Sequence, residues 1–147
     1  MQYTYEFEMW RGEAGWCIAP FGLNGATQGE DVADACESAA DWLRETVRDY
    51  VMRGQALPPA SFGNAPKRGG VTVVVSVDAA MSEIPRMSAA EAAHALGVTR
   101  PRVTAMLASG LLDGWRDGRN TWVTKASVRA RLADERKAGR PRAAAAK

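Results

Sequence analysis

The stretch SAAEAAHALGVTRPRVTAML, residues 88–107, predicts two short helices joined by a tight turn. Ser88 and Glu91 have the spacing of a capping box, in which each side chain accepts a hydrogen bond from the other residue's backbone amide. Gly97 suits the position that closes a helix, because glycine readily adopts the left-handed conformation needed there. Thr99 suits the N-cap of the helix that follows.

The apolar residues of this stretch predict how the two helices pack. Those expected to face a shared core are Ala92, Ala93, Leu96, Val103, Met106 and Leu107. The small Ala93 lets the helices cross closely, and Gly97 follows it by four residues, with Val103 six residues further on. A helix, a glycine turn and a second helix at this spacing are typical of a helix-turn-helix motif.

The second helix begins with Arg100, Pro101 and Arg102, and its two cations need an explanation. Positive charges at a helix N-terminus oppose the helix dipole, whereas Pro101 is tolerated because a first-turn amide has no intrahelical partner. The second helix of a helix-turn-helix enters the DNA major groove with its N-terminal residues. We therefore predict that Arg100 and Arg102 contact bases or adjacent phosphates. Thr104 is a lesser candidate, and Thr99 is expected to contact a phosphate.

The next two segments extend this domain. The segment GWRDGRNTWV, residues 114–123, predicts a β-hairpin, because an Asp-Gly pair separates two short polar and aromatic runs. Thr124 then caps a third predicted helix over residues 125–138. We interpret one or both of Trp115 and Trp122 as covering the small core across the hairpin, the alternative being that they face DNA.

Residues 87–132 resemble the winged helix-turn-helix of excisionase and MerR-type proteins. The match rests on the run Ala-Ala-x-x-Leu-Gly-Val-Thr, the Ser-Gly-Leu after the second helix and the Gly-Arg of the hairpin. The resemblance implies that the hairpin is a wing beside the recognition helix. It also implies that Arg116 and Arg119, on this wing, reach the DNA backbone or the minor groove.

Charge is distributed unevenly along the 147 residues. Residues 1–78 contain 6 Lys or Arg and 11 Asp or Glu, which gives a net charge of −5. Residues 79–147 contain 13 Lys or Arg and 6 Asp or Glu, which gives a net charge of +7. An acidic half followed by a basic half indicates two domains with different partners, the basic one suited to nucleic acid. The predicted organisation is an α+β domain at 1–80, a linker at 81–86, a DNA-binding domain at 87–138 and a disordered basic tail at 139–147.

The acidic half predicts three strands, a helix and a fourth strand, which is a small α+β layer with the helix on one sheet face. Alternation in YTYEFEMW, residues 3–10, predicts a strand whose Glu6 and Glu8 face solvent. The apolar stripe expected along the helix consists of Val32, Cys36, Ala39, Leu43, Val47 and Tyr50. The β-branched run VTVVVSVD, residues 71–78, predicts a largely buried strand.

Within this half, GATQGEDVADACESAADWL at residues 25–43 and GQALPPAS at residues 54–61 resemble the HicB antitoxin family. The match covers about residues 1–78 and centres on Thr27-Gln28-Gly29, Ala35, Ala39 and Leu57-Pro58. The resemblance implies a partial ribonuclease H fold that binds and neutralises a small basic ribonuclease toxin, HicA. An acidic domain suits a basic partner, because opposite charges steer association.

The ribonuclease H resemblance also raises an RNA-processing enzyme as an alternative. A two-metal nuclease needs several carboxylates that converge on one site. Glu6 and Glu8 share a strand face, but no further acid is placed to join them, so we expect no catalytic residues, metal or cofactor. Cys17, Cys36 and His94 lack the spacing of a zinc site. We interpret the cysteines as small buried residues and the histidine as a surface residue.

These features together predict a HicB-like antitoxin that neutralises a HicA-like toxin and represses its own operon through the C-terminal domain. We expect a homodimer or a higher homo-oligomer, because such proteins pair to match two DNA half-sites, and the exposed sheet edge of the first domain is a candidate interface. The alternative is a stand-alone regulator or excisionase-like factor whose first domain serves oligomerisation. No apolar run approaches the roughly 20 residues that cross a bilayer, and the N-terminus lacks a signal-peptide pattern, so we expect a cytoplasmic protein without membrane partners.

Overall fold

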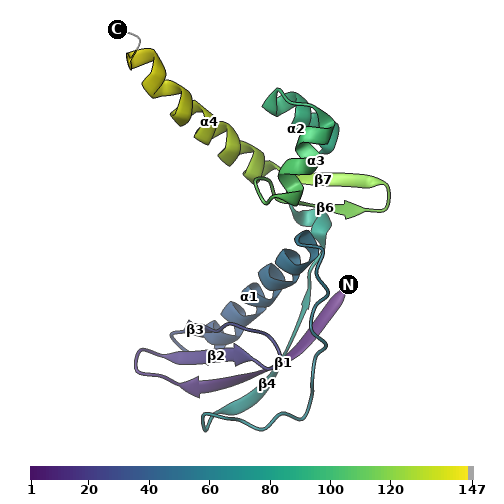
Figure 1. Ribbon diagram of the computed structural model, residues 1–147. Helices are drawn as coiled ribbons and strands as arrows, with labels where there is room; N and C mark the ends of the chain where they lie inside the picture. Colours follow the sequence, from purple (N-terminus) through teal and green to yellow (C-terminus); the bar gives the residue numbers. More distant parts are fainter. Residues whose placement is uncertain (146–147) are drawn as a thin grey trace. The chain divides into compact units, whose positions relative to one another are not determined.

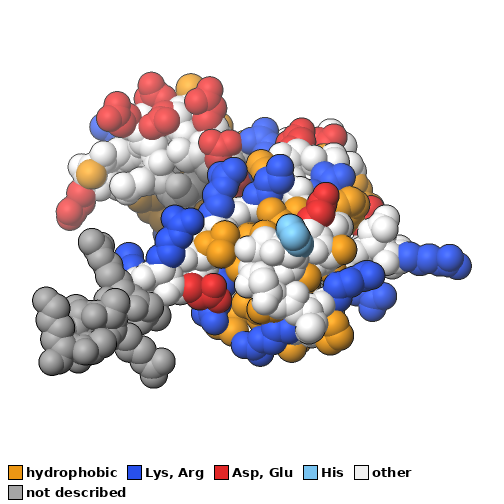
Figure 2. All heavy atoms as spheres, turned by 90° about the horizontal axis from the view of Figure 1, so that it is seen from above, with side chains coloured by type: hydrophobic (Ala, Val, Ile, Leu, Met, Phe, Trp, Pro, Cys, Tyr) orange, Lys and Arg blue, Asp and Glu red, His pale blue; other side chains and the backbone are white. Residues whose placement is uncertain are grey.

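The structure, a computed structural model, describes the backbone of residues 1–145 and the side chains of residues 1–137. This part of the chain contains four α-helices and seven β-strands in two antiparallel sheets, which confirms the predicted α+β class. The chain divides into two compact units, the first from Met1 to Met81 and the second from Ser82 onward, and each is described by itself (Figure 1). Charged side chains of both signs project from the face drawn in Figure 2.

The first unit is a four-stranded antiparallel sheet with one long helix along one face (Figure 1). Its elements are β1 (Gln2–Arg11), β2 (Trp16–Pro20), β3 (Thr27–Gly29), α1 (Val32–Met52) and β4 (Val71–Asp78). This order matches the predicted sequence of three strands, a helix and a strand. Across the sheet the order is β3-β2-β1-β4, so the first and last strands of the unit pair with each other.

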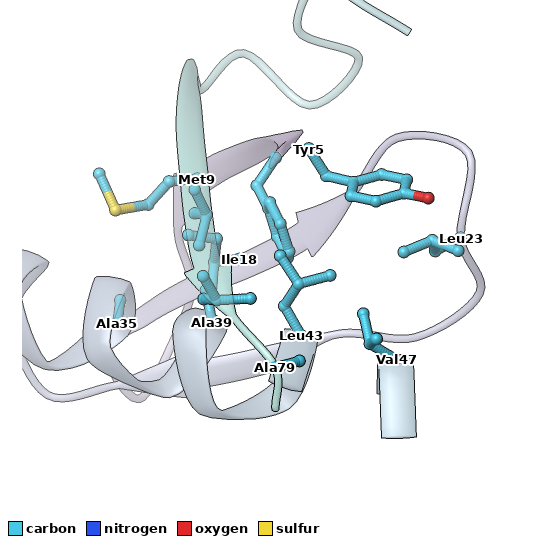
Figure 3. Packing of buried hydrophobic residues seen from close by; sticks show 12 residues of the cluster. Tyr5, Met9, Ile18, Leu23, Ala35, Ala39, Leu43, Val47 and Ala79 are labelled. Carbon is cyan, nitrogen blue, oxygen red and sulfur yellow. The ribbon is translucent and has the colours of Figure 1, made fainter. Parts of the chain in front are cut away.

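Helix α1 is capped by Asp31, whose carboxylate accepts a hydrogen bond from the Asp34 amide at 2.8 Å. The residues that face the sheet recur every four positions and are Ala35, Ala39, Leu43 and Val47, all fully buried. They pack against apolar residues of the sheet, among them Tyr5, Met9 and Ile18 (Figure 3). The prediction that Val32 belongs to this stripe is wrong, because it lies at the exposed start of the helix with 44% of its surface accessible.

The opposite face of the sheet corrects a second prediction. Glu6 and Glu8 were expected to face solvent, yet they are only 6% and 2% exposed, because the loop at residues 61–70 lies over them. The Glu6 carboxylate accepts hydrogen bonds from the Gly63 amide at 2.6 Å and from the Asn64 amide at 3.1 Å. The Asn64 side-chain amide donates a third, at 3.0 Å. Glu6 therefore anchors the first part of this loop to β1.

Glu8 anchors the second part of the same loop. Its carboxylate accepts hydrogen bonds from the backbone amides of Lys67, Arg68 and Gly70, at 2.8, 2.7 and 3.2 Å. A buried carboxylate is tolerated only when such donors replace its water shell. The alternating glutamates of β1 therefore hold a loop that would otherwise leave its own amides without partners.

Both glutamates should make the first unit sensitive to acid. The amide of Asn64 lowers the pKa of Glu6 more strongly than burial raises it, with the Gly63 amide adding to the effect. Burial opposes ionisation of Glu8, but its three amide hydrogen bonds and the charge of Arg68 together hold its pKa below the ordinary value of 4.5. A pKa lowered in the folded state means stability that is present above the unfolded-state pKa and is lost as the pH falls through the folded-state value.

We therefore expect stability against urea to fall steeply below about pH 4.5, and the fall to be smaller in the double variant Glu6→Gln, Glu8→Gln. Urea titrations at neutral and acid pH measure this difference. The control is Glu37→Gln, which changes an exposed glutamate of α1 and should leave the pH dependence as it is. If the double variant and the wild type lost the same stability against urea at acid pH, these two carboxylates would not be the source of the pH dependence.

Strand β4 is an edge strand, not the largely buried strand that its β-branched sequence predicted. It pairs only with β1. Val75 and Val77 face α1 and are buried, whereas Val74 is 62% and Val71 is 52% exposed. A valine-rich run is compatible with either position, because sequence alone does not say whether a neighbouring strand covers its second edge.

The second unit contains a three-stranded sheet and three helices (Figure 1). Its elements are β5 (Arg86–Ser88), α2 (Ala89–Leu96), α3 (Arg100–Ala108), β6 (Gly114–Asp117), β7 (Asn120–Thr124) and α4 (Lys125–Ala145). The strand order is β5-β7-β6. The buried core is formed by Ala89, Ala92, Ala93, Leu96, Val103, Met106, Leu112, Val123 and Val128.

Two predicted boundaries in this unit need correction. The segment predicted as a linker, 81–86, contains a turn of 3-10 helix at Met81–Glu83 and the first residue of β5, Arg86, which pairs with Thr124. Helix α4 does not end near residue 138 but continues to Ala145, through most of the predicted disordered tail. Its alanine-rich end has a high helix propensity. Residues 146–147 lie outside the described residues.

Among the helices that the structure describes, none is both long and apolar enough to cross a bilayer. The two longest, α1 and α4, have 21 residues each. Both contain charged side chains at short intervals along their length.

Candidate nucleic-acid interface

Both ends of α2, and the turn that follows it, are formed by the local signals that predicted them. The Ser88 amide donates to the Glu91 carboxylate at 2.7 Å, and the Glu91 amide donates to the Ser88 hydroxyl at 3.1 Å, which completes the capping box. Gly97 closes α2 with a φ of +67°, a conformation that strongly favours glycine. The turn at Gly97, after which the Val98 amide donates to the Ala93 carbonyl at 3.0 Å, determines where α3 begins relative to α2.

The start of α3 carries two arginines without an opposing charge. The Thr99 hydroxyl accepts a hydrogen bond from the Arg102 amide at 3.3 Å and so caps the helix, as predicted. The side chains of Arg100 and Arg102 are exposed, and the first turn contains no acidic residue. None of the ion pairs observed among residues 1–137 involves either arginine. Their charges therefore oppose the helix dipole within the protein itself.

The two sides of α3 differ in burial. Val103 and Met106 are 0% and 2% exposed and belong to the core, while Arg100 and Thr104 are exposed one turn apart. The Thr104 hydroxyl donates to the Arg100 carbonyl at 3.3 Å, so its oxygen remains free to accept a hydrogen bond and its methyl group remains free for an apolar contact. The exposed side of α3 thus combines cations with a small amphipathic side chain.

The hairpin of β6 and β7 presents the other two arginines predicted to bind DNA. Arg116 lies opposite Thr121 in the strand register, and Arg119 shares the two-residue loop with Gly118. The φ of Gly118 is +60°, which explains the glycine in this tight turn. Both arginine side chains are exposed.

The base of the hairpin lies directly against α3. At Gly114 an added Cβ would stand 2.1 Å from the Trp122 carbonyl oxygen and 2.8 Å from Leu107 Cδ2 of α3. Such spacing leaves no room for a side chain, so the missing Cβ is what allows the hairpin and the helix to approach. Arg116 lies two residues further along the same strand and therefore on the same face of the hairpin as Gly114.

The structure brings Arg100 and Arg119 together, although they are 19 positions apart in the sequence. Both line a small pocket of about 110 Å³. Its other lining residues are Ser88, Ala89, Ala90, Asn120, Thr121 and Trp122, from the start of α2 and the hairpin. Arg102, Thr104 and Arg116 are exposed but do not line this pocket. The pocket thus joins the recognition-helix candidate to the tip of the hairpin.

The two tryptophans of the hairpin have different environments. They lie opposite each other in the register, with Trp115 buried at 8% exposure and Trp122 half-buried. The Arg86 guanidinium stacks 4.5 Å from the centre of the Trp122 ring and donates to the Ser82 carbonyl at 3.0 Å. Arg86 was assigned to the linker, because a three-residue strand is too short to show a period in the sequence.

The two cysteines and the histidine that were considered as metal ligands do not form a metal site in the part of the chain that the structure describes. Across the described residues, no group of three or more His, Cys, Asp or Glu side chains is placed to hold a metal ion. Cys17 and Cys36 are free and half-buried, which is less buried than predicted. His94 is exposed on α2, and several Lys and Arg side chains stand out from the surface around it (Figure 2).

No protein-family model matches the chain, and no curated protein matches its sequence.

Proposed function

We propose that the protein is a HicB-like antitoxin that binds its own operator DNA through the second unit and a small basic ribonuclease toxin through the first. In this proposal the second unit works as a winged helix-turn-helix. Helix α3 enters the major groove, and the β6–β7 hairpin is the wing.

The observation that carries the DNA-binding proposal is the pair of exposed arginines at the start of α3. Arg100 and Arg102 have no acidic partner among the described side chains and oppose the helix dipole. DNA supplies the anionic partner that turns this local cost into a favourable interaction. The second unit also belongs to the basic half of the chain, whose net charge is +7.

The positions of the predicted contact residues support a division of roles. Arg100 and Arg102 suit the O6 and N7 atoms of guanine, and Thr104 suits a thymine methyl group or a base-edge donor. Thr99 and the amides at the start of α3 suit a phosphate. Arg116 and Arg119 on the hairpin suit the backbone beside the groove or the adjacent minor groove.

The acidic surface of α1 supports the proposal of a basic protein partner for the first unit. Its outward acids recur every three or four residues and are Asp34, Glu37, Asp41, Glu45 and Asp49, all exposed. Arg44, Arg48 and Arg53 pair with the last three of them, at 2.7, 2.9 and 3.1 Å. The carboxylates of these pairs are exposed, and ion pairs at the surface are weak, so a basic partner can compete for these acids.

A gel-shift experiment with the full chain and the DNA upstream of its own gene tests the proposal. We expect specific retardation that weakens steeply as the salt concentration rises, because bound phosphates release counterions. The control is unrelated DNA of equal length and base composition. Equal affinity for the two DNAs, or no binding at low salt, contradicts the proposal.

Co-expression of the tagged chain with its neighbouring genes tests the toxin arm separately. Co-purification of a small basic protein whose ribonuclease activity is suppressed by this chain supports the antitoxin. Specific DNA binding without such a protein supports the stand-alone regulator instead.

A further inference from the structure

The outer edge of β4 has free backbone groups in a regular array. The Ala79 amide donates to the Met1 carbonyl, which indicates that the odd-numbered residues of this register exchange hydrogen bonds with β1. In an antiparallel pair, alternate residues direct their N–H and C=O groups to opposite sides. The backbone groups of Thr72, Val74 and Ser76 therefore point away from β1. Among the described residues, no backbone–backbone hydrogen bond reaches this outer edge.

This edge lacks the features that usually prevent strands from pairing. Edge strands are commonly short, interrupted by proline or a bulge, or protected by lysine. Strand β4 has eight residues, VTVVVSVD, and contains no lysine, arginine, proline or glycine. Its most exposed side chain is Val74, at 62%. The strand is thus a template for another extended segment.

We propose that β4 pairs in an antiparallel manner with β4 of a second copy of this chain, with Val74 opposite Val74 of the second copy. This register joins two four-stranded sheets into one continuous eight-stranded sheet about a two-fold axis. The proposal does not depend on DNA or toxin binding.

The side chains of β4 are self-complementary in this register. The two Val74 side chains cover each other, and Thr72 lies opposite Ser76 of the second copy. These two hydroxyls keep the partners they have within one copy, where Thr72 donates to the Asn64 carbonyl at 2.8 Å and Ser76 donates to the Gln2 side chain at 3.2 Å. On the other face, Val73 lies opposite Val75 of the second copy. A charged or irregular partner strand would not match this uncharged array as well.

Charge also favours this arrangement. The only charged residue of β4 is Asp78 at its end, while Lys67 and Arg68 lie shortly before its start. Antiparallel pairing places Asp78 opposite Gly70 of the second copy, two residues from that copy's Arg68. Asp78 already pairs with the N-terminal ammonium of its own copy at 2.9 Å, so its charge is compensated, and no like charges face each other along the paired strands.

Hydrogen exchange measured by NMR on the full chain tests both the pairing and its register. As the protein concentration rises, the amides of Thr72, Val74 and Ser76 should become protected, whereas those of Val73, Val75 and Val77 should be protected throughout. Sedimentation should show a dimer over the same concentrations. A monomer at all concentrations, or a dimer without new protection at these three amides, overturns the proposal.

Variants at Val74 sharpen the test. Val74→Lys places a charge opposite its own symmetry mate and should abolish the concentration-dependent protection, with the fold retained because the side chain is exposed. Val32→Lys changes an exposed valine at the start of α1 and should leave the dimer unchanged. Val74→Cys should form an intermolecular disulfide on mild oxidation, because directly opposite Cα atoms in such a pair lie about 5.5 Å apart. A dimer that survives Val74→Lys uses another surface and overturns the proposal.

Discussion

Arg100→Ala is expected to weaken operator binding by about 1–3 kcal/mol, which is about fivefold to 150-fold, and to relax the sequence preference at one base pair. The same change should leave the protein as stable as the wild type or slightly more stable, because it removes a cation that opposes the dipole of α3. Loss of binding without loss of stability distinguishes a DNA contact from a structural role. Gel-shift titrations and thermal unfolding of the same preparation measure the two effects.

Arg129→Ala provides the matched control for this variant. Arg129 is an exposed arginine of α4, so its replacement removes the same charge from the same unit without changing α3. A pure charge effect would weaken DNA binding similarly in both variants and would leave base preference unchanged. Equal affinities of Arg100→Ala and the wild type would remove Arg100 from the interface. Arg102→Ala then tests whether the second cation of α3 carries the contact instead.

Gly29→Ala is expected to cause a large loss of stability in the first unit. An added Cβ would lie 2.2 Å from the Ala35 backbone nitrogen and 2.6 Å from both Ala35 Cα and the Asp34 carbonyl carbon. These are backbone atoms of α1, which cannot rotate away as a side chain can. The helix or β3 must shift, and we expect a cost of about 3 kcal/mol, near the upper end for overpacked sites.

Urea unfolding of Gly29→Ala measures this cost, and Gly54→Ala is its control. Gly54 follows the end of α1 with a φ of +65°, and an added Cβ there meets no atom within 4 Å. Its replacement should therefore cost only about 1 kcal/mol, the strain of a left-handed alanine. Similar losses in the two variants would show that close approach of β3 to α1 is not the reason for the glycine of the Thr-Gln-Gly segment.

Several errors of the sequence-based predictions share one cause, which the two glutamates of β1 illustrate. Alternation in residues 3–10 correctly predicted a strand, but the partners of Glu6 and Glu8 are amides 55 or more positions away in the chain. The side-chain pattern of a strand reports that its two faces differ. It does not report whether water or a distant loop covers the polar face.

The edge position of β4 and the pairing of Arg86 with Thr124 were missed for the same reason. Valine-rich sequence says only that a residue tolerates a pleated, partly buried surface. Whether a strand lies at the centre or the edge of a sheet depends on which other segments pair with it. A three-residue strand such as β5 forms because it pairs with β7, and its own sequence is too short to show a strand pattern.

The sequence by itself determined the features that rest on contacts three or four residues apart. The caps formed by Ser88, Glu91 and Thr99 and the glycine turn at Gly97 belong to this class, because the atoms that stabilise them are neighbours in the chain. The exposed cations of α3 follow from the same local geometry.

Only the tertiary structure decided which distant residues meet. It placed Arg119 of the hairpin beside Arg100 of α3, covered Glu6 and Glu8 with a loop, and left one edge of β4 unpaired. The first two arrangements require the closure of a long segment of chain, whose entropic cost is recovered only when the unit that contains it packs its core. The balance between loop-closure entropy and core packing depends on residues far apart in the chain, so a local sequence pattern cannot determine it.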